Sequence, residues 1–273
     1  MAKGKYDDLV KRLGRLRPND FVQWLCSDLG KVQSVSFEDR EFELTHRRVD
    51  VLYKVKTKEV GEFYFHLEFQ GALKRDFSIR LHEYATRIRR EFKLPVRTVA
   101  VFLSSTKAIR NLIPVDRCKI AGEVVSEFHY TKLILPRENW KSIIAKRLPA
   151  LLPLIPLTKI PKGEEQKALA KAADGIESLL DDELRSELAA VFYLVGGYTY
   201  PENVRQVIGE KLMLDLMKSA TYRETFEAGE KKKAKAIAKN MLAKSCDIAF
   251  IAEVTGLSAD EIRKLKAEPG KPS

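Results

Sequence analysis

One segment constrains the fold of this chain more than any other: residues 47–70, with the sequence RRVDVLYKVKTKEVGEFYFHLEFQ. It predicts two strands joined by a short loop at residues 58–61, in which Gly61 can adopt the positive φ angle that a tight turn requires. Side chains on a strand point to alternate faces. If the loop centres on Glu59, Asp50 lies opposite Glu68, and the two side chains share one face of the hairpin.

The two acidic side chains are therefore predicted to lie close together. Directly opposed residues on one face of a hairpin have Cβ atoms about 5 Å apart, and two carboxylates at that distance repel each other unless a cation lies between them. Apolar residues flank both positions, as in a buried central hairpin, where an uncompensated acidic group is costly. A divalent metal held by oxygen ligands is the first candidate, and a solvated strand face is the alternative.

The hairpin and the residues that follow it resemble a known family. Asp50, a short hairpin and then Glu68-Phe69-Gln70 resemble the motif of the PD-(D/E)XK nuclease superfamily, with Gln70 in the place of the more usual lysine. Arg80 and Tyr84 narrow the resemblance to the Rpn family of recombination-promoting nucleases, often described as transposases, in which an acidic-x-Gln element precedes an Arg…Tyr helix. The resemblance covers roughly residues 6–157, with a weaker similarity at the C-terminus.

This resemblance implies a fold and a metal site. The fold class is α/β, a restriction-endonuclease-like core with a mixed sheet, followed by a C-terminal all-α extension. Mg²⁺, or Mn²⁺ in its place, would be held by Asp50, Glu68 and the backbone carbonyl of Phe69. Asp7 of the first helix is a further candidate ligand, and an exposed residue or helix cap is the alternative for it. The metal would lower the pKa of a bound water and shield the charge of the scissile phosphate.

Two more polar residues share the face of Glu68. Gln70 is the third catalytic candidate, but it is neutral and can only hydrogen-bond to the water or the phosphate. His66 could assist as a base, or it could pair with a neighbour across the sheet.

A basic helix is predicted after the hairpin. Apolar residues from Phe77 to Phe92 recur at helical spacing and form one stripe, while the opposite face presents arginines, Arg80 among them. By resemblance, Arg80 and Tyr84 face the site or its phosphate. The alternative is a solvated helix face, with Tyr84 covering the core. The expected DNA or phosphate contacts come from Arg48, Arg80, Tyr84 and Arg87.

Composition limits the class of protein. The 273 residues are 45% hydrophobic, enough for a sizeable core. The net charge of +11 fits a polyanionic partner, because neutralising phosphates releases counterions, although many basic proteins bind no nucleic acid. The three cysteines are widely spaced and odd in number, which indicates a reducing compartment. Without a signal peptide or an apolar stretch that could span a membrane, a cytoplasmic protein with no membrane partner is expected.

Proline residues mark a seam in the chain. The apolar stretch at residues 148–161 contains four prolines and cannot form one regular helix. We therefore expect a nuclease-like domain in residues 1–157 and a helical extension in residues 158–273. The extension ends in a helix, a turn at Gly256 and a second helix capped by Ser258. This pair looks like a helix-turn-helix and resembles the C-terminal tail of the Rpn family, although such pairs more often pack or mediate association than read DNA.

The predicted function is metal-dependent endonucleolytic hydrolysis of phosphodiester bonds in DNA, which by resemblance would promote recombination or accompany mobile elements. A homodimer is expected, because two active sites related by a two-fold axis can cut both strands of a duplex. A DNA-binding protein that has lost cleavage is the first alternative, since Gln70 replaces a lysine. A transposase is the second alternative, but its active site would require a third acidic residue, and no acidic residue further along the chain has a clear place in the site. A purely helical scaffold would leave Asp50 and Glu68 unexplained.

Overall fold

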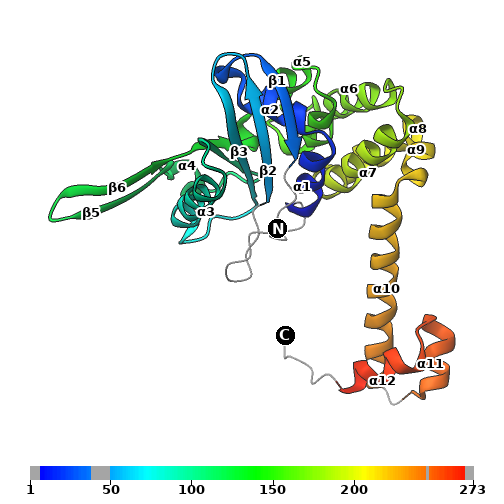
Figure 1. The fold of residues 1–273 in the computed structure, drawn as a ribbon. Coiled ribbons are helices and arrows are strands. Elements are labelled where there is room, and N and C mark those ends of the chain that lie inside the picture. Colours follow the sequence, from blue (N-terminus) through cyan, green and yellow to red (C-terminus); the bar gives the residue numbers. More distant parts are fainter. Residues whose placement is uncertain (1–6, 38–49, 244–245, 268–273) are drawn as a thin grey trace. The chain divides into compact units, whose positions relative to one another are not determined.

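The computed structural model describes residues 7–37, 50–243 and 246–267 (Figure 1). The chain divides into two compact units, Met1–Leu216 and Met217–Ser273. The first contains a mixed five-stranded sheet together with helices, and the second is helical where it is described. The predicted fold class, an α/β mixed-sheet core followed by an all-α part, is confirmed.

The central sheet contains the predicted hairpin. Its strand order is β1-β2-β3-β4-β7, antiparallel from β1 to β3 and parallel from β3 to β7. The strands are β1 (Val32–Phe37), β2 (Val51–Thr57), β3 (Gly61–Gln70), β4 (Val96–Phe102) and β7 (Thr131–Ile134). Val51 pairs with Leu67, so the register predicted from the loop is confirmed. Gly61 has a φ of +83°, the conformation that the turn requires.

Helix α3 (Phe77–Phe92) connects β3 to β4 and packs against β4. Its predicted apolar stripe is confirmed, because Phe77, Leu81, Ala85 and Ile88 are buried. Arg80 is only 8% exposed, which rules out the alternative of a solvated helix face for this residue. Oxygen atoms of β3 accept hydrogen bonds from its guanidinium group, and these bonds compensate the cost of burying the charge.

Of the two N-terminal helices, the first packs against β2 and β3, and the second packs against β1. They are α1 (Asp7–Leu16) and α2 (Pro18–Leu25), followed by the 3₁₀ turn η1 (Ser27–Leu29). The Tyr53 hydroxyl donates a hydrogen bond of 2.7 Å to the carbonyl oxygen of Gly14. A Cβ atom on Gly14 would lie 3.0 Å from that hydroxyl, so glycine permits the close approach. This contact also places the preceding turn of α1, which contains Lys11, beside Asp50 at the beginning of the hairpin.

Between β4 and β7 the chain leaves the sheet and forms an arm. After α4 (Lys107–Asn111), strands β5 (Val115–Ile120) and β6 (Glu123–His129) pair only with each other and project from the first unit (Figure 1). Ala121 and Gly122 form the turn, with φ angles of +50° and +89°. β5 was not anticipated, because its sequence VDRCKI contains no continuous apolar run.

The proline-rich seam forms a buried 3₁₀ helix, η3 (Pro149–Leu157), in agreement with the prediction that it is no regular α-helix. It follows η2 (Leu135–Arg137) and α5 (Trp140–Ala145), and it precedes α6 (Glu165–Glu177), α7 (Asp182–Thr199), α8 (Pro201–Lys211) and α9 (Met213–Lys218). α6 and α7 both pack on η3. The compact units therefore divide after Leu216 and not after Leu157, and a self-contained domain of residues 1–157 stays a prediction.

The second unit is a small helical cluster. Its helices are α10 (Ala220–Ala243), α11 (Ile248–Thr255) and α12 (Ala259–Ala267). Their core consists of Ala238, Ile251, Leu257 and Ile262. Within the described ranges of either unit, no helix combines the length and the hydropathy that a membrane span requires.

Candidate active site

The hairpin brings Asp50 and Glu68 together. Asp50 stands directly before β2, and its Oδ2 accepts a hydrogen bond of 3.0 Å from the backbone amide of Phe69. In return, the Asp50 amide lies 3.4 Å from Glu68 Oε2. Both carboxylates are largely removed from solvent, with side-chain exposures of 10% for Asp50 and 6% for Glu68. The sequence-predicted pair is thus one buried acidic cluster.

Burial and mutual repulsion oppose ionisation of this cluster. The pKa of Asp50 is raised from an ordinary value of 3.8 to about 7. Desolvation is the larger cause, and the negative charge of Glu68 is the second. Lys11 acts in the opposite direction, because its charge and its hydrogen bond favour the ionised form. A carboxylate in this state gains free energy from any additional cation beside it.

Two basic side chains compensate the acidic pair. Lys11 reaches from α1, and its Nζ lies 2.8 Å from Asp50 Oδ1. Arg80 reaches from α3, and its Nη2 lies 3.3 Å from Glu68 Oε1. The sequence interpretation missed Lys11. Its position one helical turn after Asp7 was the available signal, because residues four apart share one face of a helix.

Gln70 is held by its surroundings. Its Oε1 accepts a hydrogen bond of 3.1 Å from Arg80 Nη2, and its Nε2 donates one of 2.5 Å to the carbonyl oxygen of Ala72. The side chain is buried at the end of β3, on the same face as Glu68. Arg80 therefore links the acidic and the amide positions of the motif.

His66 lies beneath the acidic pair and is fully buried. Its Nδ1 is 3.5 Å from the Thr98 hydroxyl on β4, which agrees with a partner across the sheet. Its Nε2 lies 3.5 Å from Glu68 Oε2 and forms no hydrogen bond with the described residues. The ring of Tyr84 meets the imidazole edge to face at 5.7 Å, so Tyr84 points toward this layer of the site.

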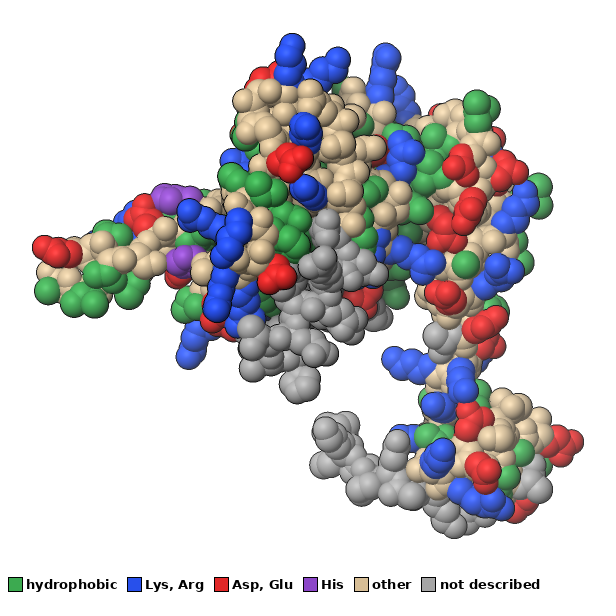
Figure 2. Space-filling model, in the orientation of Figure 1, with side chains coloured by type: hydrophobic (Ala, Val, Ile, Leu, Met, Phe, Trp, Pro, Cys, Tyr) green, Lys and Arg blue, Asp and Glu red, His purple; other side chains and the backbone are tan. Residues whose placement is uncertain are grey.

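The remaining predicted contact residues are placed only in part. Arg87 is half-buried and lies two turns after Arg80 on the same face of α3. Lys and Arg side chains gather over the part of the surface where α3 lies (Figure 2). Arg48 lies outside the described residues. Asp7 is the first residue of α1, but its side chain also lies outside them.

The oxygen donors of the cluster suit a hard divalent cation. Within the described residues, no group of three or more His, Cys, Asp and Glu side chains is placed to hold a metal ion. Mg²⁺, however, is commonly bound through one or two carboxylates and keeps several waters. Asp50 and Glu68 fit that requirement by their chemistry, because the repulsion between them is what a cation would relieve.

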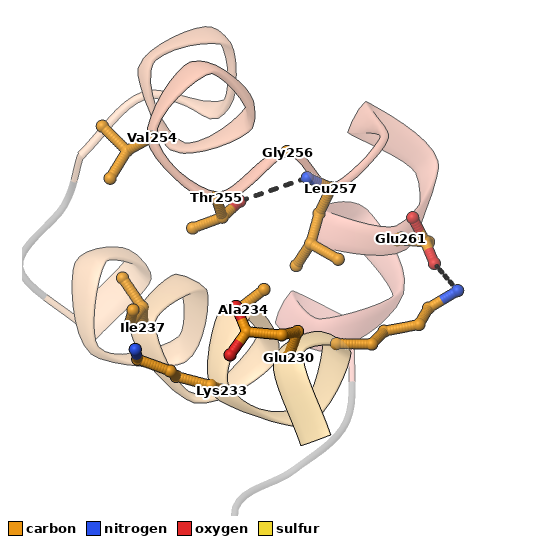
Figure 3. A pocket seen from close by; sticks show the side chains of 10 residues that line it. Glu230, Lys233, Ala234, Ile237, Val254, Thr255, Gly256, Leu257 and Glu261 are labelled. Atoms are coloured by element: carbon orange, nitrogen blue, oxygen red, sulfur yellow. Dashed lines mark hydrogen bonds and ion pairs between the residues drawn. The ribbon is translucent and has the colours of Figure 1, made fainter. Parts of the chain in front are cut away.

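The second unit contains a helix-turn-helix. α11 ends at Gly256, whose φ is +69°, and Ser258 caps α12 by accepting a hydrogen bond of 3.3 Å from the Glu261 amide. Glu261 Oε2 returns to the Ser258 amide at 3.1 Å, which completes a capping box. A pocket of about 410 Å³ lies between α10 and this turn (Figure 3). The ion pair between Lys231 and Glu261, 2.8 Å long, closes one side of it.

Comparison with known families identifies this helical region. Residues 231–267 match the family model described as the Rpn/YhgA-like nuclease family, C-terminal HTH domain. The resemblance to the Rpn family is confirmed. The Rpn match lies in the second unit, whereas the acidic cluster lies in the first. No match was found among curated proteins or among solved structures.

The Rpn match supports a general class of function but no specific reaction. A protein similar to this nuclease family is expected to have a nuclease or transposase-like role, and an HTH domain is a DNA-binding type of unit. The match covers the C-terminal helices only. The roles of Asp50, Glu68 and Gln70 therefore depend on the geometry of the hairpin.

Proposed function

We propose that this protein is a Mg²⁺-dependent DNA endonuclease with a restriction-endonuclease-like core, and that Mn²⁺ can substitute. The observation that carries the proposal is the buried pair of carboxylates, Asp50 and Glu68, each of which lies against the backbone of the opposite strand at the open end of the central hairpin. Such a pair is unfavourable by itself and becomes favourable around a divalent cation. The similarity of residues 231–267 to an HTH domain supports DNA as the substrate.

Asp50, Glu68 and the carbonyl oxygen of Phe69 would hold the metal. When bound, it supplies an activated water and neutralises charge on the scissile phosphate. The backbone amide of Phe69 orients Asp50 through its 3.0 Å hydrogen bond. Arg80 orients Glu68 and Gln70 together, and Gln70 offers only hydrogen bonds to the water or the phosphate. Arg48, Tyr84 and Arg87 are the proposed further contacts to DNA.

Lys11 supplies a positively charged side chain, which the nuclease-like motif of this chain lacks at position 70. In the motif that the hairpin resembles, a lysine usually follows the glutamate by two residues, and here that position is Gln70. Lys11 brings an ammonium group within 2.8 Å of Asp50 from a different element, α1. A lysine near a phosphate acts as a compact positive charge, so Lys11 can serve the same electrostatic role from the other side of the site.

A DNA-binding protein without cleavage is the second candidate. Lys11 and Arg80 already form ion pairs with the two acids, and both polar ends of the Gln70 amide are engaged by the protein. In that case the basic side chains would replace the metal. A transposase wants a third acidic residue, and the described residues contain no such three-residue group.

Cleavage of supercoiled plasmid separates these functions. Wild-type protein is incubated with Mg²⁺ or Mn²⁺ and compared with Asp50→Ala and Glu68→Ala. Glu62→Ala is the matched control, because Glu62 lies on the same strand but is exposed. The proposal expects nicking or linearisation by wild type and control, loss in both site variants, and loss on chelation. Binding without cleavage under either metal would establish the second candidate. Cleavage that survives both site substitutions would place the chemistry elsewhere.

A further inference from the structure

The arm formed by β5 and β6 is anchored at its root and bare at its tip. At the root, the His82 ring stacks on Phe128 with centroids 4.9 Å apart, and His82 Nδ1 lies 2.8 Å from Asp116 Oδ2. Beyond these contacts the two strands pair only with each other. A two-stranded ribbon alone is marginally stable in water, and its open edges can pair with another chain.

The tip of the arm exposes apolar side chains. Ile120 is 65% exposed, Val124 49% and Val125 54%. Hydrophobic side chains are visible at the end of the arm in Figure 2. Glu123 lies among them, immediately after the turn. The tip therefore combines an aliphatic surface with one acidic group, Glu123, and one basic group, Lys119, which lies opposite Val124.

A pocket of about 530 Å³ lies at the root of the same arm. Its floor includes the apolar residues Ala85, Leu94 and Val96, and two basic residues, Arg89 and Lys93, also line it. Its volume is in the range of roughly 300–1,000 Å³ that is typical of binding pockets in proteins. The root pocket thus offers apolar surface and two basic groups, and its acidic lining residue, Glu127, is already paired with Arg117 and His129. The tip offers aliphatic side chains and the carboxylate of Glu123.

We propose that the arms of two copies of this chain lie side by side around a two-fold axis, with the tip of each in the root pocket of the other. In an isologous contact every tip-to-root interaction occurs twice, so one complementary pair of surfaces is sufficient. Glu123 of each copy faces Arg89 and Lys93 of its partner, and the aliphatic tip fills the apolar part of the pocket. The open strand edges pair along arms about 20 Å long.

The charge of the arm favours a second copy over nucleic acid. Residues 115–129 contain three acidic and two basic residues in a protein with a net charge of +11. Arg117 is already bonded to Glu127, so part of this charge is compensated inside the arm. A surface with this balance gains little from phosphates. The dimer itself does not depend on nuclease activity. Only one consequence of the dimer rests on the proposed function: its two active sites could cut the two strands of a DNA duplex.

The first test is the molar mass of the full chain, measured by light scattering after size exclusion at about 10–100 µM, a range set by the modest area of such contacts. We expect a wild-type dimer and a monomer for Ile120→Lys combined with Val124→Lys. Leu180→Lys is the matched control, because Leu180 is 98% exposed on the same unit and lies outside the arm. Unchanged thermal unfolding of the arm variant would show that the fold is intact.

A charge exchange tests the tip-to-root contact itself. Glu123→Lys and Arg89→Glu, each alone, are expected to weaken the dimer at least tenfold, and the combined variant is expected to restore it. The middle of the arm has its own probe in Cys118, which is exposed, whereas Cys26 is buried; Cys246, which is partly exposed, is replaced by serine in this experiment. A short bismaleimide is expected to link two wild-type chains through Cys118, and not the Ile120→Lys, Val124→Lys variant.

Three results would overturn the proposal. Wild-type protein could be a monomer throughout the concentration range. Its dimer could persist in the tip variant, which would place the interface elsewhere. The arm variants could also keep the wild-type mass and lose affinity for DNA, which would make the arm a nucleic-acid contact.

Discussion

Replacement of Asp50 by asparagine is predicted to stabilise the metal-free protein at high pH while it abolishes cleavage. The pKa of Asp50 rises from 3.8 to about 7 on folding, mainly through desolvation and the charge of Glu68. At about 1.4 kcal/mol per tenfold change in proton affinity, the ionised carboxylate costs the folded state about 4 kcal/mol. Asparagine keeps an oxygen that can accept the hydrogen bond from Phe69 and removes the charge.

The sign of the effect follows from proton linkage. Below pH 4 the carboxyl is protonated in both states, so its charge contributes no penalty. Between pH 4 and 7 the unfolded chain ionises first, and stability falls as the pH rises. Above pH 7 the full penalty of about 4 kcal/mol is present. The pKa of about 7 already includes the opposing attraction of Lys11. Asparagine reproduces the hydrogen bonds of the protonated carboxyl only in part, so we expect a gain of about 2 kcal/mol at pH 8 and little at pH 4.5.

Urea unfolding followed by tryptophan fluorescence measures this effect, because Trp24 and Trp140, the two tryptophans of the chain, both lie in the first unit. Asp182→Asn is the matched control, since Asp182 is exposed and paired with Arg185 on the surface. All samples contain chelator. Mg²⁺ is then expected to raise the stability of wild type and not of Asp50→Asn. If wild type and variant lose equal stability between pH 4.5 and pH 8, the reasoning about Asp50 is refuted.

Three further variants test other parts of the structure. Arg80→Met is expected to destabilise the first unit by about 3–5 kcal/mol, because Glu68 is left buried without its partner, and Mg²⁺ should recover part of the loss in urea unfolding; equal losses with and without Mg²⁺ would contradict the metal site. Ser258→Ala should cost about 1 kcal/mol in thermal unfolding followed by circular dichroism, since Glu261 loses its capping partner, and an unchanged transition would argue against the capped helix. The third variant replaces the three exposed lysines on one face of α10 by glutamine, in the Asp50→Asn background and with chelator. The slope of log DNA affinity against log salt concentration should become shallower by about three. An unchanged slope would exclude this face, which consists of Lys232, Lys235 and Lys239.

The hairpin was predictable because its information is local. Alternation of side chains and a glycine in the turn fix which residues of β2 and β3 are opposed, and Val51 indeed pairs with Leu67. The apolar stripe of α3 and the capped C-terminal pair follow for the same reason. By contrast, β5 is polar and carries no periodic apolar signal, and it is a strand only because β6 pairs with it. The boundary between the units also depended on the packing of α6 and α7 against η3.

The sequence by itself determined the acidic pair. Once Asp50 and Glu68 occupy opposed positions of one hairpin, their proximity is fixed by the strand period and requires no other part of the chain. Only the tertiary structure decided what neutralises them. Lys11 and Arg80 lie outside the hairpin, in α1 and α3. Their contacts with the carboxylates therefore depend on how those helices pack on the sheet. Burial of the pair, and with it the raised pKa of Asp50, is likewise a property of the assembled core, because desolvation arises from atoms contributed by many distant segments.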